Sequence, residues 1–146
     1  MKIATITAVK NCPINYLEIH HKLLREAGYD RNILIDESSL EKYSQDYKKL
    51  DYEIKRIEVE GMWNKSKALN ASISLLKDED AVFFIDATTL VSPDHRKIVE
   101  ENFDANLILA PDEIETISFD DLKRVDLKKI WENKNNIKLS RNSIGV

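Results

Sequence analysis

The chain has 146 residues, 42% of them hydrophobic and 33% charged, so its length and composition predict one globular domain with its own core. Its net charge of −4 argues against a general nucleic-acid-binding protein. It has no apolar run of membrane-spanning length and no signal peptide, and its single cysteine, Cys12, cannot form an internal disulfide, which together predict a cytoplasmic protein.

Strand and helix patterns alternate along the first part of the chain. Residues 2–8 are short, β-branched and nearly uncharged, which predicts a buried strand. Residues 13–27 place apolar side chains on one face and stop before Gly28, which predicts a helix. Residues 32–35 predict a second short strand, and the charged segment 39–50 predicts a surface helix.

The same alternation continues through the middle of the chain. Residues 52–59 predict a third, less buried strand. Residues 64–77 give the clearest helical pattern, with Asn64 as its N-cap. The apolar stripe expected on this helix consists of Ala68, Leu69, Ile73 and Leu76. Residues 81–85 predict the central buried strand of the sheet.

The last third of the chain has weaker patterns. Residues 93–103 predict a helix with Pro93 in its first turn, and residues 105–110 predict another apolar strand. A capping box beginning at Ser118 predicts a last helix that runs to about Trp131. The polar tail that follows is expected to fray.

Strands that alternate with helices predict an α/β fold with three layers, a mostly parallel sheet covered by helices on both faces. Right-handed crossovers bring the carboxyl ends of all these strands to one rim, where open α/β sheets bind their ligands. The segments expected at that rim are residues 8–11, 36–39, 61–65 and 86–89.

Two carboxylates are the strongest candidates for a site at this rim. Asp36 and Asp86 are each the first acid after an apolar strand, so each is expected to be partly buried. A buried carboxylate needs a partner such as a hydroxyl, a cation or a backbone donor. The structural alternative is that each acid only caps a helix or closes a loop. Their occurrence on one rim favours a site.

Lys65 is the candidate cation. It lies in the first turn of the helix predicted over residues 64–77, where the helix dipole disfavours a positive charge. An anion bound at that helix N-terminus would reverse the balance, whereas the structural alternative is a solvated surface lysine. The three histidines and Cys12 show no metal-binding or nucleophile spacing, and phosphate-loop and dinucleotide fingerprints are absent.

Four segments of the chain, taken in order, resemble the family 2 glycosyltransferases, which have the GT-A fold and use nucleotide-diphosphate sugars. They are similar to the family's first strand and loop, its Val-Asp-Asp-Gly-Ser-Thr segment, its Lys-Ala-Gly-Ala-Leu-Asn-Ala-Gly run and its Leu-Asp-Ala-Asp-Thr-Leu segment. The matching residues are 7–11 followed by 16–18, 33–39, 65–71 and 85–94.

The resemblance covers about residues 2–111 and implies one GT-A-like domain over residues 1–146. Residues 1–111 would be the nucleotide-sugar-binding half, and residues 112–146 a reduced acceptor-side segment. The resemblance also implies that Asp36 contacts the base of a nucleotide such as UDP, that Lys65 lies near the diphosphate and that Asp86 holds Mg²⁺ or Mn²⁺. The full implied nucleotide-sugar site is Ala8, Asn11, Asp36, Ser38, Lys65, Asp86 and Thr88.

Three departures from the family pattern weaken these implications. Lys10 replaces the aromatic residue usual near the base. Thr88 replaces the second acid of the Asp-x-Asp motif, and a neutral hydroxyl is a poorer ligand for a hard cation, so the metal site is weakened. After Pro111, nothing clearly matches the family's signals for a catalytic base.

The sequence therefore supports two main hypotheses. The first is a small glycosyltransferase that moves a sugar from a nucleotide-diphosphate donor to an acceptor. The second is a catalytically inactive GT-A-like module that binds a nucleotide or a protein. A plain α/β regulatory domain has weaker support, and a nucleotidyltransferase is disfavoured because no glycine-rich signature lies near the first strand. The donor, the acceptor, and any protein partner or second copy of the chain are left open.

Overall fold

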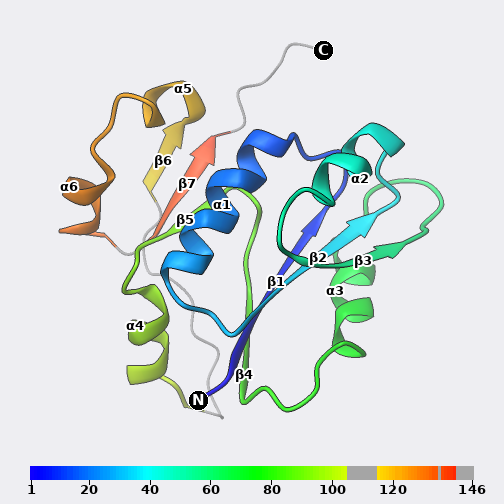
Figure 1. Ribbon diagram of the computed structural model, residues 1–146, viewed down its shortest axis with the longest axis horizontal. Helices are drawn as coiled ribbons and strands as arrows, with labels where there is room; N and C mark the ends of the chain where they lie inside the picture. Colours follow the sequence, from blue (N-terminus) through cyan, green and yellow to red (C-terminus); the bar gives the residue numbers. More distant parts are fainter. Residues whose placement is uncertain (105–114, 135, 141–146) are drawn as a thin grey trace.

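The computed structural model describes residues 1–104, 115–134 and 136–140 (Figure 1). The first half contains β1 (Ile3–Val9), α1 (Ile14–Glu26), β2 (Arg31–Glu37), α2 (Glu41–Tyr47), β3 (Glu53–Ile57) and α3 (Lys65–Ile73). The second half contains β4 (Ala81–Phe84), β5 (Thr89–Val91), α4 (His95–Glu101), β6 (Glu115–Ser118), α5 (Phe119–Leu122), α6 (Leu127–Trp131) and β7 (Asn136–Ser140).

The main sheet has four strands in the order β3-β2-β1-β4, and every neighbouring pair is parallel. Helices α1 and α2 cover one face of this sheet and α3 covers the other (Figure 1). Successive side chains of β2 alternate between the faces, so Leu34 packs with α1 and α2 whereas Ile33 and Ile35 pack with α3. The expected fold class, a parallel sheet flanked by helices on both faces, is confirmed.

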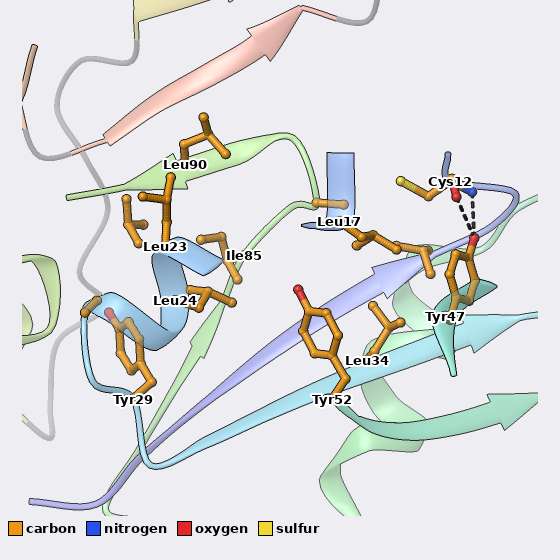
Figure 2. Close-up of a cluster of buried hydrophobic side chains, with 14 of the residues drawn as sticks. Cys12, Leu17, Leu23, Leu24, Tyr29, Leu34, Tyr47, Tyr52, Ile85 and Leu90 are labelled. Carbon is orange, nitrogen blue, oxygen red and sulfur yellow. Dashed lines mark hydrogen bonds between the residues drawn. The ribbon is translucent and has the colours of Figure 1, made fainter. Parts of the chain in front are cut away.

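The larger core lies between the sheet and α1, because one stripe of that helix is apolar. Leu17 and Leu24 of this stripe are fully buried, and Figure 2 shows them packed over β1 and β2. The helix ends as expected: Ala27 is its C-cap, and Gly28 follows with a φ of 78°, a conformation that glycine adopts without a steric penalty.

Helix α2 is more than a surface helix, because Tyr47 at its end is fully buried. The Tyr47 hydroxyl accepts a hydrogen bond from the Cys12 amide at 2.7 Å and lies 3.1 Å from the Cys12 carbonyl oxygen (Figure 2). Burial raises the pKa of Tyr47 to about 12, so the hydroxyl stays protonated. This side chain therefore fixes α2 against the loop that follows β1.

Helix α3 begins where the sequence predicts but ends early. The Asn64 side chain accepts a hydrogen bond from the Lys67 amide, which confirms the N-cap. The helix stops at Ile73, and the buried positions on it are Ala68 and Ser72. Ile73, expected in the apolar stripe, is 57% exposed, so that part of the prediction is wrong.

The strand expected at the centre of the sheet is β4, which among the described strands pairs only with β1. It is only partly buried, and Phe84 is half exposed, so the expectation of a buried central strand is wrong for the described part of the chain. The predicted strand over residues 105–110 lies outside the described residues.

A second sheet with the order β5-β7-β6 was not expected from the sequence. Strand β7 is antiparallel to β5 and parallel to β6. The helix predicted to begin at Pro93 begins at His95 instead. The predicted last helix is two short helices, α5 and α6, although Ser118 caps α5 through the Asp121 amide as expected. None of the helices in the described part has the length and apolar character needed to cross a lipid bilayer.

Candidate functional site

The carboxyl ends of β1, β2, β3 and β4 lie along one side of the main sheet, because all four strands are parallel. We call this side the carboxyl rim and define it as residues 8–13, 36–40, 57–65 and 85–88. All seven residues of the expected nucleotide-sugar site lie on it. Asp36 lies opposite Val9, and the amide of Ile85, just before Asp86, donates to the Ile6 carbonyl. The two acids therefore flank β1.

The Asp36 side chain is only 2% exposed and is held by three partners. Its Oδ1 accepts from the Ser39 amide at 3.1 Å. Its Oδ2 accepts from the Ser44 hydroxyl at 2.6 Å and from the Arg56 guanidinium at 3.0 Å. Both oxygens are thus used inside the protein, and a nucleotide base could contact Asp36 only by displacing one of these donors.

Glu37, the next residue, faces the opposite side of the sheet and is fully buried. Its Oε1 accepts a hydrogen bond from the Asn64 amide at 2.9 Å. Its Oε2 is buried and has no hydrogen-bond partner. Glu37 therefore fixes the start of α3 to the end of β2, a role that the sequence analysis did not predict.

Asn11 and Ser38 hold the loops of the rim together. Both have a positive φ, 52° for Asn11 and 48° for Ser38. The side-chain oxygen Oδ1 of Asn11 accepts a hydrogen bond from the Leu40 backbone amide at 2.7 Å. The backbone amide of Asn11 donates a hydrogen bond to the Ser39 hydroxyl at 2.8 Å. The Ser38 hydroxyl accepts from the Val59 amide at 2.7 Å. These two expected site residues therefore have structural bonds within the rim.

Lys65 and Asp86 are in direct contact. The Lys65 ammonium, at the first residue of α3, donates a hydrogen bond to Oδ1 of Asp86, and the two form an ion pair. Their side chains are 47% and 43% exposed, so solvent and a ligand can reach both. This is the one pair of expected site residues that the structure brings together through their side chains.

A second ammonium lies on the same rim. The Lys10 side chain reaches from the loop after β1 to the Gly61 carbonyl oxygen, at 3.2 Å. Gly61 belongs to the loop that leads into α3 and has a φ of 86°. Lys10 was noted in the sequence only as a departure from the family pattern, yet its ammonium contacts the loop that positions Lys65.

Ala8 and Thr88 complete the expected set. Ala8 lies near the end of β1 opposite Ile35, packed on the α3 side of the sheet. Thr88 is 6% exposed and follows Asp86 in the short turn closed by the bond from the Thr89 amide to the Asp86 carbonyl. The turn has one carboxylate, where an Asp-x-Asp sequence would supply two.

The free protein offers a divalent metal few ligands at this turn. Mg²⁺ is usually held by one or two carboxylates, and waters and substrate phosphates supply its other oxygens. Asp86 is paired with the Lys65 ammonium, and Thr88 offers only a neutral hydroxyl. Both oxygens of Asp36 already accept hydrogen bonds from Arg56, Ser39 and Ser44. No group of three His, Cys, Asp or Glu side chains suited to a metal occurs within residues 1–104 and the described segments after them.

His20 of α1 lies behind the turn that carries Asp86. Its ring is 1% exposed, and its Nδ1 lies 2.8 Å from the Tyr52 hydroxyl oxygen. Burial and the neighbouring His21 lower the pKa of His20 to about 3, although the nearby Asp86 acts in the opposite direction. His20 is therefore neutral at physiological pH and supports the turn as an uncharged, buried group.

A pocket of about 370 Å³ lies at the opposite side of the sheet, where β2 and β3 begin. Each of its charged lining groups has an ion-pair partner: Arg25 contacts Asp51 at 2.7 Å, Arg31 contacts Glu53 at 2.6 Å, and Asp30 contacts Arg96, outside the lining, at 3.1 Å. We call it the amino-end pocket. It contains none of the expected site residues.

No family model matches the chain, and no curated protein matches its sequence. Solved structures do match its fold. A structure of S. aureus TarS residues 1–349 in complex with UDP is 16% identical, with a TM-score of 0.51, over 69% of this chain and 31% of that one. A nucleotidyl transferase from Methanothermobacter is 16% identical, with a TM-score of 0.53, over 80% of this chain and 61% of that one.

A third structure matches nearly the full length of the chain. It is Rv0371C from Mycobacterium tuberculosis in complex with manganese, 15% identical, with a TM-score of 0.53, over 95% of this chain and 87% of that one. The chain spans only 24% and 39% of two further TarS structures that it matches. At these identities the likeness shows the fold alone, a parallel sheet flanked by helices on both faces.

Proposed function

We propose that this chain binds a nucleotide-diphosphate sugar at the carboxyl rim and transfers the sugar to an acceptor. The observation that carries the proposal is the exposed Lys65 ammonium, placed at the first residue of a nine-residue helix on the rim. A diphosphate has the opposite charge and would gain from both the ammonium and the helix N-terminus. Because one fold hosts many reactions, the proposal depends on this site and not on the fold alone.

The chemistry expected of the rim follows from the charge that develops during transfer. When the bond between the sugar and the diphosphate breaks, negative charge builds on the leaving phosphate oxygen. In this proposal Lys65 donates a hydrogen bond to that oxygen. The acceptor oxygen forms the new bond to the sugar carbon as the bond to the phosphate breaks. Asp86, freed when the Lys65 ammonium moves to the phosphate, accepts the proton that the acceptor hydroxyl loses.

The rest of the rim would act as a frame for the ligand. Asp36 and Arg56 fix the end of β2 to β3, and Glu37 fixes the start of α3. Asn11 joins the loops that follow β1 and β2. In this proposal the nucleotide lies along these loops, and the base contact expected of Asp36 is replaced by contacts with the loops that Asp36 supports. The solved structure of TarS with UDP supports a uridine nucleotide as the first ligand to test.

A non-catalytic, nucleotide-binding module is the second candidate. One observation favours it: both oxygens of Asp36 are used internally. Such a module would bind a nucleotide at the rim but would not turn over a sugar donor. It would act through a protein partner or a second copy of the chain.

A thermal-shift titration with UDP, GDP and their sugars tests the proposal. A ligand that binds only the folded chain stabilises it by about 2.7 kcal/mol at 100 times its Kd, which raises the Tm of a domain of this size by several degrees. Turnover of the sugar nucleotide that binds best, followed by release of the free nucleoside diphosphate, separates the two candidates. Absence of any shift across the panel would contradict both.

A further inference from the structure

The turn over residues 86–88 offers a metal few ligands. Asp86 is its single carboxylate, and the hydroxyl that follows it, on Thr88, is neutral and almost buried. Of the other rim acids, Asp36 and Glu58 are bonded to Arg56, and Glu37 accepts from the Asn64 amide through one oxygen. Glu60 is exposed on the loop before α3. A metal at the turn would therefore depend on Asp86 alone for a charged protein ligand, with waters and phosphates supplying its other oxygens.

The one exposed carboxylate of the turn is already neutralised. The Lys65 ammonium is bonded to Asp86, so a dication at Asp86 would have to displace it or lie beside another positive charge. Like charges at such short range repel, even in a half-exposed site. The ammonium thus occupies the position where a metal would otherwise meet the protein.

A second ammonium lies on the same rim, near the start of α3. Lys10 is anchored at the Gly61 carbonyl, on the loop that ends at Lys65. The first turn of α3 adds the partial positive charge of its free amide groups. Two ammonium groups and a helix N-terminus together provide the compensation that a diphosphate otherwise draws from a metal ion.

We infer that Lys65, assisted by Lys10, takes the place of a divalent metal, so that this chain binds a nucleoside diphosphate without any metal ion. The inference rests on the proposed function and goes further, because it fixes how the charge of the ligand is balanced. It also predicts that the bound diphosphate breaks the contact between Lys65 and Asp86.

Calorimetric titration of UDP into the full chain, in Mn²⁺ and in EDTA, tests this inference. The expected result is a Kd that agrees within about twofold between the two buffers. Lys65→Met should weaken binding at least about tenfold in both buffers, since a hydrogen bond to a charged group is lost. Lys67→Met is the matched control, because Lys67 is exposed on the same helix turn, and its Kd should match that of the original chain.

The possible results separate the inference from the proposed function. Binding that needs Mn²⁺ and disappears in EDTA would overturn the inference and leave the proposed function intact. Equal loss of affinity in Lys65→Met and Lys67→Met would also overturn it, because the loss would then come from the change in net charge and not from a contact made by Lys65. Absence of UDP, GDP and pyrophosphate binding in both buffers would overturn the proposed function, and the inference with it.

A metal titration without nucleotide gives an independent readout. Free Mn²⁺, measured by electron paramagnetic resonance, should show no saturable binding to the original chain at about 1 mM metal. The double variant Lys65→Met with Thr88→Asp restores two carboxylates and removes the ammonium, so it should bind Mn²⁺ measurably. A circular dichroism spectrum confirms that this variant folds. Saturable Mn²⁺ binding to the original chain, lost on Asp86→Asn, would overturn the inference.

Discussion

The ammonium of Lys65 bonds to the carboxylate of Asp86 across 21 positions of sequence and joins the start of α3 to the turn after β4. Both side chains are about half exposed, so this pair is not a core salt bridge. Exposed pairs of this kind contribute little to stability. We therefore expect the pair to matter for ligand binding. The Asp86 carboxylate holds the Lys65 ammonium at the carboxyl rim, and an anionic ligand can replace Asp86 as its partner.

Replacement of Arg56 tests the structural role of Asp36. Arg56→Met leaves the buried Asp36 carboxylate without its counter-ion but with its bonds to Ser44 and Ser39. Because Arg56 is itself partly exposed, we expect a loss of about 1–2 kcal/mol in the free energy of unfolding, measured by urea denaturation.

The matched control is Lys55→Met, at the neighbouring exposed position of β3. It should change the free energy of unfolding by less than about 0.5 kcal/mol. If the two variants lose the same amount, the pair between Arg56 and Asp36 does not stabilise the rim, and Asp36 becomes a free candidate for contact with a nucleotide.

Asn64 provides a second test, because it caps α3 just before Lys65. Asn64→Ala removes the acceptor for the Lys67 amide and should lower the free energy of unfolding by about 1 kcal/mol. Asn70→Ala, an exposed site inside the same helix, should be neutral or slightly stabilising, since alanine is the better helix former. Equal effects from the two substitutions would show that the cap does not hold the helix start.

The three buried histidines make stability depend on pH. Burial lowers the pKa of His20 to about 3 and that of His95 to about 4, below the value of about 6.5 in an unfolded chain, and it also lowers the pKa of His21. The unfolded chain therefore binds more protons below pH 6.5, and stability falls as the pH falls. His20 and His95 should each remove about 2 kcal/mol between pH 7 and pH 5.

Urea denaturation at several pH values measures this dependence. His95→Gln should lessen the loss between pH 7 and pH 5 by about 2 kcal/mol, the contribution of this one histidine, whereas Lys67→Gln should leave the loss unchanged. His95 lies 2.6 Å from the Tyr29 hydroxyl and packs against Phe83, so the variant will also be less stable at pH 7. An unchanged slope in His95→Gln would show that His95 is not the group responsible.

Local patterns were sufficient to predict most of the main sheet and its helices. Strand β1 and helix α1 begin and end within about two residues of their predicted bounds, because apolar periodicity and the stop at Gly28 are encoded within the segment. The caps at Asn64 and Ser118 were predicted for the same reason, since a cap depends on neighbours only three residues away.

The second sheet and much of the rim depend on distant partners and could not be predicted in this way. Strand β5 has three residues, and it is a strand only because β7 pairs with it. The bond between Asp36 and Arg56 depends on the register of β2 against β3, which places the two residues opposite each other. Two adjacent acids on one strand point to opposite faces, and this rule could have separated Asp36 from Glu37.

The most direct test of the central claim is a map of amide chemical shifts in a ¹⁵N-labelled sample titrated with UDP. If UDP binds at the carboxyl rim, the largest changes will fall on residues 8–11, 61–67 and 86–89, and Lys65→Met will greatly reduce them. Changes confined to the amino-end pocket, or no changes at a UDP concentration that saturates an independent binding assay, would contradict the claim that this ligand binds at the carboxyl rim.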